Sequence, residues 1–462
     1  MKSNLSLIVV AAIRGRGKMV RIFTRRVGIG FLCISSVVSL IGCSGLVRRD
    51  APPLSYRDAV PAGFSEDVMY VDDRGQGAEA RSTPVLWDMH PAIADAPINV
   101  LALSGGGSGV AFGAGAIVGW TRAGTRPEFQ IVTGVSAGAL LAAYAFLGPS
   151  WDATISQAFS GAGTQHLFQA RWIGALVGAS VYRGEPLAKL VDQCVTDRLL
   201  RAVAAESAKG RLLLVATTDL DRGRTVIWNL GRIAAVGGEP ARRLFRDLLV
   251  ASASIPGVFP PVLIRVQRSG VEFDEMHVDG STTAPFFIAP EIAAVAPGGI
   301  GELQGANVYV IVNAQLGGNA VTTPVHTVSI VKRGVNAALE SSSRAAVEVA
   351  LSVSNRSGMT LHVSHIPDDY PFTGLLDMRR VTMSALFEFG VRCATQESLW
   401  GSAAHALAGV RQSNLTIPSH RVPDCPAPSA SLPAVRETAT AGRTQLAAAA
   451  VASFELGVTA NP

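Results

Sequence analysis

The sequence predicts an α/β protein with a mainly parallel central sheet that carries helices on both faces. Short apolar runs without polar alternation recur between residues 98 and 366, as is typical of strands buried on both faces. Helical patterns lie between these runs, and strand–helix alternation favours a parallel sheet. Apolar residues make up 48% and charged residues 16% of the 462 residues, which is enough apolar sequence for a large core.

The predicted elements follow one another along the chain without an internal repeat. Strand candidates are the apolar runs of residues 98–104, 129–136, 211–220, 225–230, 307–314 and 360–366. Helical patterns begin at residue 110 and recur at residues 136–148, 240–254 and 330–355. Residues 421–437 are rich in Pro, Ser and Ala, which indicates a linker near the C-terminus.

The N-terminus has the pattern of an export signal. A basic segment at residues 19–28 precedes an apolar run at residues 29–42. This run is shorter than the roughly 20 residues that a membrane-spanning helix needs, and it has the size of a signal-peptide core. A start at Met19 would give a signal of ordinary length, so both Met1 and Met19 stay open as the first residue.

The apolar run ends in the letters LIGC, which resemble the lipobox of bacterial lipoproteins. The resemblance implies a signal peptide at residues 1–42 and a lipid on Cys43 that anchors the mature chain in a membrane. Because the neutral Ser44 follows, it also implies the outer membrane of the bacterial cell envelope. An ordinary secretory signal or a short anchor is the alternative.

Charge and cysteine content narrow the class of protein further. The net charge is +5, and no basic patch with interleaved aromatic residues follows the signal, so no nucleic-acid partner is expected. Outside the signal and Cys43, the thiols are those of Cys194, Cys393 and Cys425. An export compartment permits a disulfide. A pair between Cys393 and Cys425 is favoured, with the other pairings left open.

A glycine-rich loop follows the first strand candidate and consists of Gly105, Gly106, Gly107, Ser108 and Gly109. It lacks the Gly-Lys-Ser/Thr ending of a P-loop. A dinucleotide site would need an acidic residue at the end of the next strand, where the chain has Ser136. A nucleotide ligand is therefore disfavoured.

Ser136 stands at the centre of a G-x-S-x-G motif, between Gly134 and Gly138. A strand candidate ends there and a helical pattern begins, which is the context of a nucleophile elbow. The tight turn leaves no space for side chains two residues before and after the serine. We interpret Ser136 as a nucleophile, and the amides of the glycine loop as donors to the oxyanion that its attack creates.

The sequence offers two kinds of base for Ser136. Eight histidines are present, and none stands in a motif that singles it out. Asp279 ends a short apolar run and is followed by Gly280, a pair that is most often a simple turn. His277 lies two residues before Asp279, and a structural role is favoured for it over a catalytic one.

Together, these pieces resemble the patatin-like phospholipase family over roughly residues 97–395. The glycine loop resembles the oxyanion loop of the family, and residues 134–138 resemble its serine elbow. Residues 251–261 (ASASIPGVFPP) resemble its Ala-Ser-x-x-x-Pro-x-x-Phe-x-Pro segment, and Asp279 with Gly280 resembles its Asp-Gly-Gly/Ala motif. The motifs follow the family order. Ser108 replaces a common Arg or Lys, and Ser281 replaces the last residue of the Asp motif.

The resemblance implies a three-layer α/β/α patatin-like fold and a Ser–Asp dyad in which Ser136 attacks and Asp279 accepts its proton. It also implies a lipid acyl ester, of the phospholipid or lysophospholipid class, as the substrate. A general carboxylesterase or lipase, an acyltransferase, or an inactive lipid-binding lipoprotein are the alternatives. No calcium-loop or zinc motif is found in the sequence, so no cofactor is expected, and the oligomeric state is left open.

These interpretations divide the chain into four parts. The signal peptide at residues 1–42 is followed by a tether and lead-in at residues 43–88. The catalytic domain is expected at residues 89–400, and a C-terminal extension at residues 401–462.

Overall fold

A computed structural model describes residues 48–53, 56, 59–72, 97–161, 180, 183–288, 301, 303–317, 322–409 and 424–426. These residues belong to one compact unit that ends at Ala427. The expected signal peptide and Cys43 lie outside them. Within the described ranges, no helix combines the length and the apolar character that crossing a membrane requires.

The described strands form one sheet in the order β1-β7-β8-β5-β4-β3-β9-β10-β11, with β6 paired to β5 and β2 paired to β6. Their bounds are β1 Val60–Pro61, β2 Met69–Val71, β3 Asn99–Leu103, β4 Ile131–Val135, β5 Leu212–Asp219, β6 Arg224–Asn229, β7 Val262–Arg268, β8 Val271–Asp279, β9 Asn307–Val312, β10 Thr360–His365 and β11 Gly401–Ser402. All six strand candidates are therefore strands.

The five central strands, β5, β4, β3, β9 and β10, run parallel to one another. Every residue of β4 and β5 is buried, which explains why their sequences are apolar runs without alternation. Antiparallel strands extend this parallel centre on both sides. The carboxyl ends of the parallel strands meet at one edge of the sheet, which we call the carboxyl edge, and this is where ligands bind in open α/β sheets.

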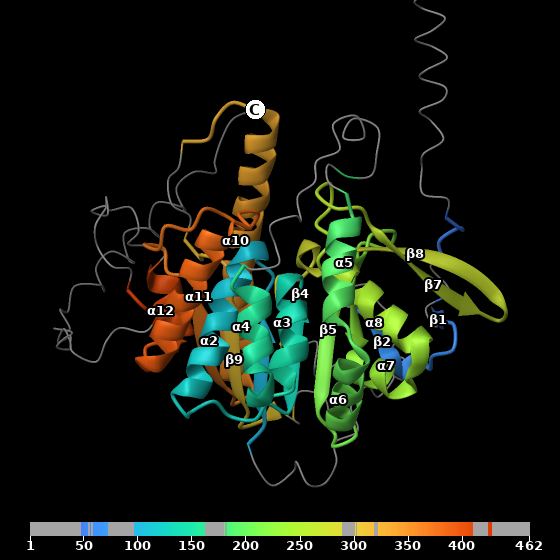
Figure 1. The fold of residues 1–462 in the computed structure, drawn as a ribbon, viewed down its shortest axis with the longest axis horizontal. Helices are drawn as coiled ribbons and strands as arrows, with labels where there is room; N and C mark the ends of the chain where they lie inside the picture. Colours follow the sequence, from blue (N-terminus) through green and yellow to red (C-terminus); the bar gives the residue numbers. More distant parts are fainter. Residues whose placement is uncertain are drawn as a thin grey trace, which may run out of the picture. The chain divides into compact units, whose positions relative to one another are not determined.

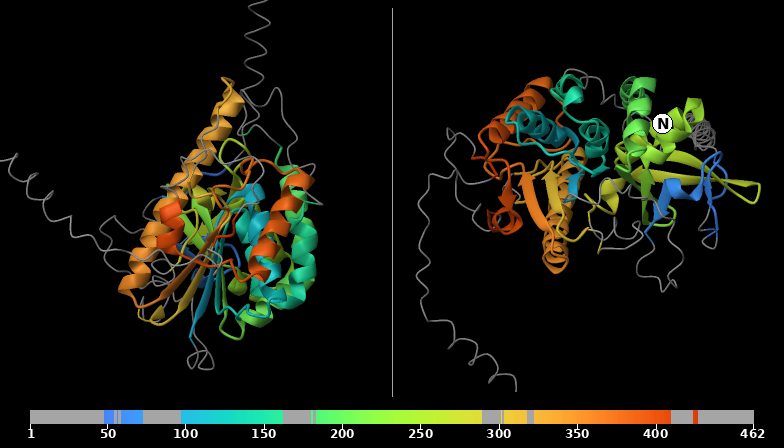
Figure 2. Two further views of the ribbon diagram at one scale, coloured as in Figure 1. Left: turned by 90° about the vertical axis from the view of Figure 1, so that its left-hand side faces the viewer. Right: turned by 90° about the horizontal axis from the view of Figure 1, so that it is seen from below.

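Helices cover both faces of the sheet, so the expected three layers are present (Figures 1 and 2). Side chains of β3 alternate between two cores: Leu101 and Leu103 face one, and Val100 and Ala102 face the other. Packed into the first core are α2 Val110–Arg122, α3 Ala137–Phe146, α4 Asp152–Phe159, α5 Glu185–Cys194, α6 Asp197–Ser207, α7 Leu230–Val236, α8 Gly238–Ser252 and α11 Arg380–Thr395. Packed into the second are α10 Thr327–Arg356 and α12 Ala403–Gly409.

The β7–β8 hairpin is absent from the predicted strands. Its sequence mixes apolar and charged residues: Arg265 of β7 and the first two residues of β8 are exposed, and β8 also carries the buried Asp274 and Glu275. The two strands are joined by Ser269 and Gly270, both with positive φ, which matches a type I′ hairpin turn. The hairpin matters for function because β8 delivers Asp279 to the carboxyl edge.

The expected tether at residues 43–88 and the expected extension beyond residue 400 both contribute strands to this sheet. Within the expected tether, β1 pairs with β7 and β2 pairs with β6. Beyond residue 400, β11 pairs with β10, and α12 packs into the second core. These strands have only two or three residues each, too few to show a periodic pattern.

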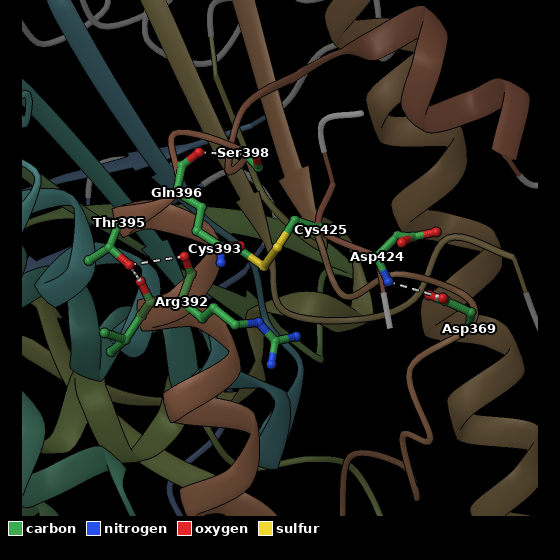
Figure 3. The surroundings of a disulfide bond; sticks show 9 residues. Asp369, Arg392, Cys393, Thr395, Gln396, Ser398, Asp424 and Cys425 are labelled. Carbon is green, nitrogen blue, oxygen red and sulfur yellow. Dashed lines mark hydrogen bonds between the residues drawn. A yellow bond between two sulfur atoms is a disulfide. The ribbon is translucent and has the colours of Figure 1, made fainter. Parts of the chain in front are cut away.

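A disulfide joins Cys393, at the end of α11, to Cys425 (Figure 3). The favoured pairing is therefore confirmed. The backbone N–H of Asp424 also donates to Asp369, with 3.1 Å between nitrogen and oxygen. The short described segment 424–426 is thus fixed to the sheet domain, and Cys194 is a free cysteine.

Candidate active site

Ser136 connects β4 to α3 in the tight turn that its motif predicts. Its φ is 56° and its ψ is −131°, a conformation that costs a residue with a side chain about 1–3 kcal/mol. Close contacts explain both flanking glycines. A Cβ on Gly134 would lie 2.6 Å from Cα of Ala139, and one on Gly138 would lie 2.4 Å from the carbonyl oxygen of Ser104.

The structure brings Ser136 and Asp279 into direct contact at the carboxyl edge, although 143 positions separate them in the sequence. Ser136 Oγ donates a hydrogen bond to Asp279 Oδ2 at 2.6 Å. The backbone N–H of Ser281 donates to Asp279 Oδ1 at 2.8 Å. Both carboxylate oxygens are therefore held, and one of them is directed at the candidate nucleophile.

Burial changes the acidity of this carboxyl group. Asp279 is only 2% exposed. The loss of water raises the pKa of Asp279 from 3.8 to about 6, while the hydrogen bonds from Ser136 and Ser281 act in the opposite direction. A carboxylate with a pKa near 6 is a stronger base than an exposed one and is still ionised at neutral pH.

The Pro-containing segment at residues 251–261, which begins in the last turn of α8, holds both residues in place. Ser252 Oγ accepts a hydrogen bond from the backbone N–H of Ser136 at 2.9 Å and donates to the carbonyl of Ala216 at 2.7 Å. Two residues later, the carbonyl of Ser254 accepts from the backbone N–H of Asp279 at 2.9 Å. The sequence motif identified this segment, but it did not predict the hydrogen bond between Ser252 and Ser136.

The glycine loop lies beside the pair, and the structure narrows the set of amides that can receive an oxyanion. The amides of Gly105, Ser108 and Gly109 already donate to the carbonyls of Pro285, Leu375 and Gly106. The amides of Gly106 and Gly107 form no hydrogen bond with the described part of the chain, and both residues line a cavity together with Ser136. These two N–H groups are the available donors.

The carboxyl end of β9 supports the glycine loop from behind. Asn313 is fully buried, and its side chain donates to the carbonyl of Ser104 at 2.7 Å. Gly106 has a φ of 156° and packs so closely that a Cβ would lie 2.0 Å from the carbonyl oxygen of Asn313. The hydroxyl of Ser108 donates to the carbonyl of Gly374 at 3.1 Å.

Two apolar cavities meet at Ser136. The larger has a volume of about 340 Å³ and is lined by Asp279, Gly106, Gly107 and apolar residues that include Ile255, Val335, Leu339 and Leu375. The smaller, of about 80 Å³, is lined by side chains that include Leu140, Phe159, Phe259 and Met383. Apart from Asp279, no charged residue lines either cavity, so both suit hydrocarbon chains.

The histidines of the described ranges do not line these cavities. His277 is fully buried on β8, where its Nδ1 lies 2.9 Å from Thr217 Oγ1 and its Nε2 lies 3.3 Å from Glu275 Oε2. Trp228 Nε1 donates to the same Thr217 oxygen at 2.8 Å. This network ties β8 to β5 and β6, which agrees with the structural role expected for His277.

Of the comparisons with known proteins, the match to a family model covers the part of the chain that holds this site. No curated protein matches the sequence. Among solved structures, the crystal structure of VipD from Legionella pneumophila is similar at 14% identity and a TM-score of 0.29, over 69% of this chain and 71% of that chain. Residues 101–291, which include Ser136, Asp279 and the glycine loop, match the family model described as patatin-like phospholipase. This part of the chain is therefore similar to the patatin-like phospholipase family.

Proposed function

We propose that this protein is a serine acyl hydrolase that cleaves acyl esters of phospholipids, lysophospholipids or related lipids. The observation that supports it most strongly is the 2.6 Å hydrogen bond from Ser136 Oγ to Asp279, formed beside the free amides of Gly106 and Gly107. A nucleophile, a base and oxyanion donors are then all within one apolar cavity.

In the first half-reaction, Ser136 Oγ attacks the acyl carbonyl carbon while its proton moves to Asp279 Oδ2. The amides of Gly106 and Gly107 stabilise the negative oxygen that develops, and one such donor contributes about 10²–10³ in kcat. The bond between the carbonyl carbon and the alcohol oxygen then breaks. The leaving alcohol takes the proton from Asp279, and the acyl group remains on Ser136 as an ester.

In the second half-reaction, water takes the place of the alcohol. Asp279 accepts a proton from the water as its oxygen attacks the acyl-enzyme, and it returns that proton to Ser136 Oγ as the fatty acid leaves. No histidine is needed, because burial has already brought the pKa of Asp279 to about 6.

The lining of the site supports a lipid as the substrate. The two cavities are apolar spaces that both border Ser136. The smaller, enclosed by Leu140, Phe159 and Phe259, suits part of an acyl chain, and the larger suits the remainder of a lipid.

We further propose that the protein is a lipid-anchored component of the bacterial cell envelope, with its anchor on Cys43. The disulfide between Cys393 and Cys425 supports this location, since disulfides persist in oxidising compartments outside the cytosol. Metabolic labelling with a radioactive fatty acid tests the anchor. Incorporation into the parent and none into Cys43→Ser is expected, and equal labelling of both would contradict it.

A fluorophosphonate probe and a panel of esters test the proposed activity. The probe is expected to label the parent and not Ser136→Ala, whereas an inactive lipid-binding protein would label in neither form. Micellar phospholipids are expected to be hydrolysed faster than monomeric short-chain esters. Faster turnover of the soluble esters would instead favour a general carboxylesterase, and transfer to an added alcohol would favour an acyltransferase.

A further inference from the structure

Helix α10 is much longer than the connection in which it lies. It has 30 residues, or about 45 Å, whereas the parallel strands β9 and β10 that it joins have six residues, or about 20 Å each. It runs back from the carboxyl edge and ends at Arg356, just before β10 begins at Thr360. Its first half therefore extends past the carboxyl edge (Figure 1). Ser136 lies at the same edge, because it directly follows β4.

The burial of α10 changes along its length accordingly. Val347, Ala350 and Val353, in its second half, are buried against the sheet. None of the described side chains between Thr327 and Ser342 is buried. This first half touches the body of the protein through Leu339, which packs against the second core, and through Asn336, whose Oδ1 accepts a hydrogen bond from the backbone N–H of Leu375 at 3.4 Å.

The outward face of this first half is apolar over residues 330–338. Between Ile330 and Ala338, the exposed residues lie at spacings of one, four, seven and eight, which places them on one side of the helix, between the exposed polar residues Thr327 and Ser341. We call these five residues the α10 stripe: Ile330, Val331, Gly334, Ala337 and Ala338. Ile330 is 52% and Val331 is 54% exposed. The basic residues Lys332 and Arg333 flank the stripe, as in helices that lie at membrane interfaces.

The stripe is continuous with the wall of the larger cavity. Val335 and Leu339, on the adjoining side of the same helix, line that cavity with Ser136 and Asp279. Ala338 belongs to both surfaces, because it lines the cavity and is also exposed. An apolar path thus leads from the solvent-facing side of α10 to the candidate nucleophile.

The N-terminal chain arrives at the same edge of the sheet. Arg48, the first described residue, donates two hydrogen bonds to Asp221, two residues beyond the carboxyl end of β5. Cys43 precedes Arg48 by five residues, which span at most about 18 Å when extended. A lipid on Cys43, as proposed above, would therefore enter its bilayer close to the carboxyl edge.

We propose that the α10 stripe lies against the phospholipid surface from which the substrate is drawn, so that the larger cavity opens toward the bilayer. This inference rests on the proposed lipid hydrolysis and adds the surface by which the protein meets its substrate. The basic flanks suit an anionic lipid surface, and the short link from Arg48 to Cys43 holds the stripe near it.

Tryptophan reporters on α10 test this contact without relying on activity. The full lipid-anchored chain is reconstituted into vesicles whose acyl chains carry bromine, with Val331→Trp as the probe and the parent spectrum subtracted. Val349→Trp is the matched control. It lies 18 residues later, five full turns on the same helix face, about 27 Å farther along, and the native Val349 is 57% exposed.

Quenching of the tryptophan at position 331 and not of the one at position 349 is the expected result. Equal quenching at both positions would overturn the proposal, as would no quenching at position 331. No quenching at position 331 is also the result expected if another part of the chain or a second protein covers the stripe.

A kinetic test separates this proposal from the proposed function. In the variant Ile330→Asp with Val331→Asp, the ratio of the rate on phospholipid vesicles to the rate on a soluble short-chain ester should fall about tenfold or more, because apolar contacts with the bilayer are lost. Val349→Asp should keep the parent ratio. An unchanged ratio in the double variant would refute the lipid contact, whereas inactivity of the parent on both substrates would refute only the proposed function.

Discussion

Removing one buried hydroxyl, in Ser252→Ala, tests how the nucleophile is held. Ser252 is fully buried, and its hydroxyl is the acceptor for the backbone N–H of Ser136. Without it, that N–H and the carbonyl of Ala216 each lose a partner. An unpaired buried polar group costs about 1–3 kcal/mol, so the free energy of unfolding should fall by about that amount.

The effect on catalysis follows from the conformation of Ser136. Its positive φ carries a strain of about 1–3 kcal/mol, which the bond to Ser252 helps to offset. If the same energy is lost from the transition state, kcat falls about 5- to 150-fold. KM should change little, because Ser252 lines neither cavity. Steady-state kinetics on one micellar lipid, together with urea unfolding, measure both quantities.

Ser254→Ala is the matched control for this substitution. Ser254 is equally buried, two residues away, and its hydroxyl donates to the carbonyl of Val250 and not to Ser136. Its own carbonyl, which holds Asp279, is unchanged by the substitution. Stability should fall with little change in kcat. The reasoning fails if Ser252→Ala keeps the parent kcat, or if Ser254→Ala loses as much.

Three further predictions concern acidity, the glycine loop and the disulfide. Because Asp279 must be ionised to accept a proton and its pKa is about 6, kcat/KM should fall as the pH drops through 6. The raised pKa stabilises the folded state at low pH, and this stabilisation is lost as the pH rises through 6. Asp279→Asn should therefore raise the free energy of unfolding by up to about 3 kcal/mol at pH 8 and by much less at pH 4. A pH-independent stability difference would contradict this. Gly106→Ala should abolish fluorophosphonate labelling, since its Cβ would lie 2.0 Å from the carbonyl oxygen of Asn313, and full labelling would exclude the close contact. Cys425→Ser should lower the free energy of unfolding by about 2–4 kcal/mol in oxidising buffer and by nothing in reducing buffer, and an equal loss in both would show that the disulfide is not responsible.

The sequence predicted the elements whose residues are buried on both sides. The strands β4 and β5 are apolar runs without polar alternation, because one face of each strand is buried in the first core and the other face in the second core. The β7–β8 hairpin was not predicted because charged residues interrupt its apolar positions, some exposed, as Arg265 and Glu272 are, and some buried, as Asp274 is. The strands β1, β2 and β11 have two or three residues each, and their pairing depends on neighbours that are distant in the sequence.

The sequence predicted those residues of the candidate site for which only one residue type is possible. It did not predict the residues that serve as hydrogen-bond partners, because several residue types can do so. Gly134 and Gly138 stand out because no other residue fits their contacts. Asn313 and Ser252 do not, since their roles arise from hydrogen bonds across long sequence separations. The same limit applies to the glycine loop. The carbonyls of Pro285 and Leu375 accept hydrogen bonds from two of the loop amides and so decide which amides are left free. These carbonyls lie far away in the sequence, so the loop sequence alone does not reveal the free amides.

The covalent intermediate provides the most direct test of the central claim, that Ser136 and Asp279 act together on a lipid ester. The protein is mixed briefly with a phospholipid, quenched in acid and digested, and the peptide that contains Ser136 is weighed by mass spectrometry. A fatty acyl group on Ser136 in the parent, and none in Ser136→Ala, is the expected result. Release of fatty acid by Ser136→Ala at the parent rate, or an acyl group found on another residue, would contradict the account.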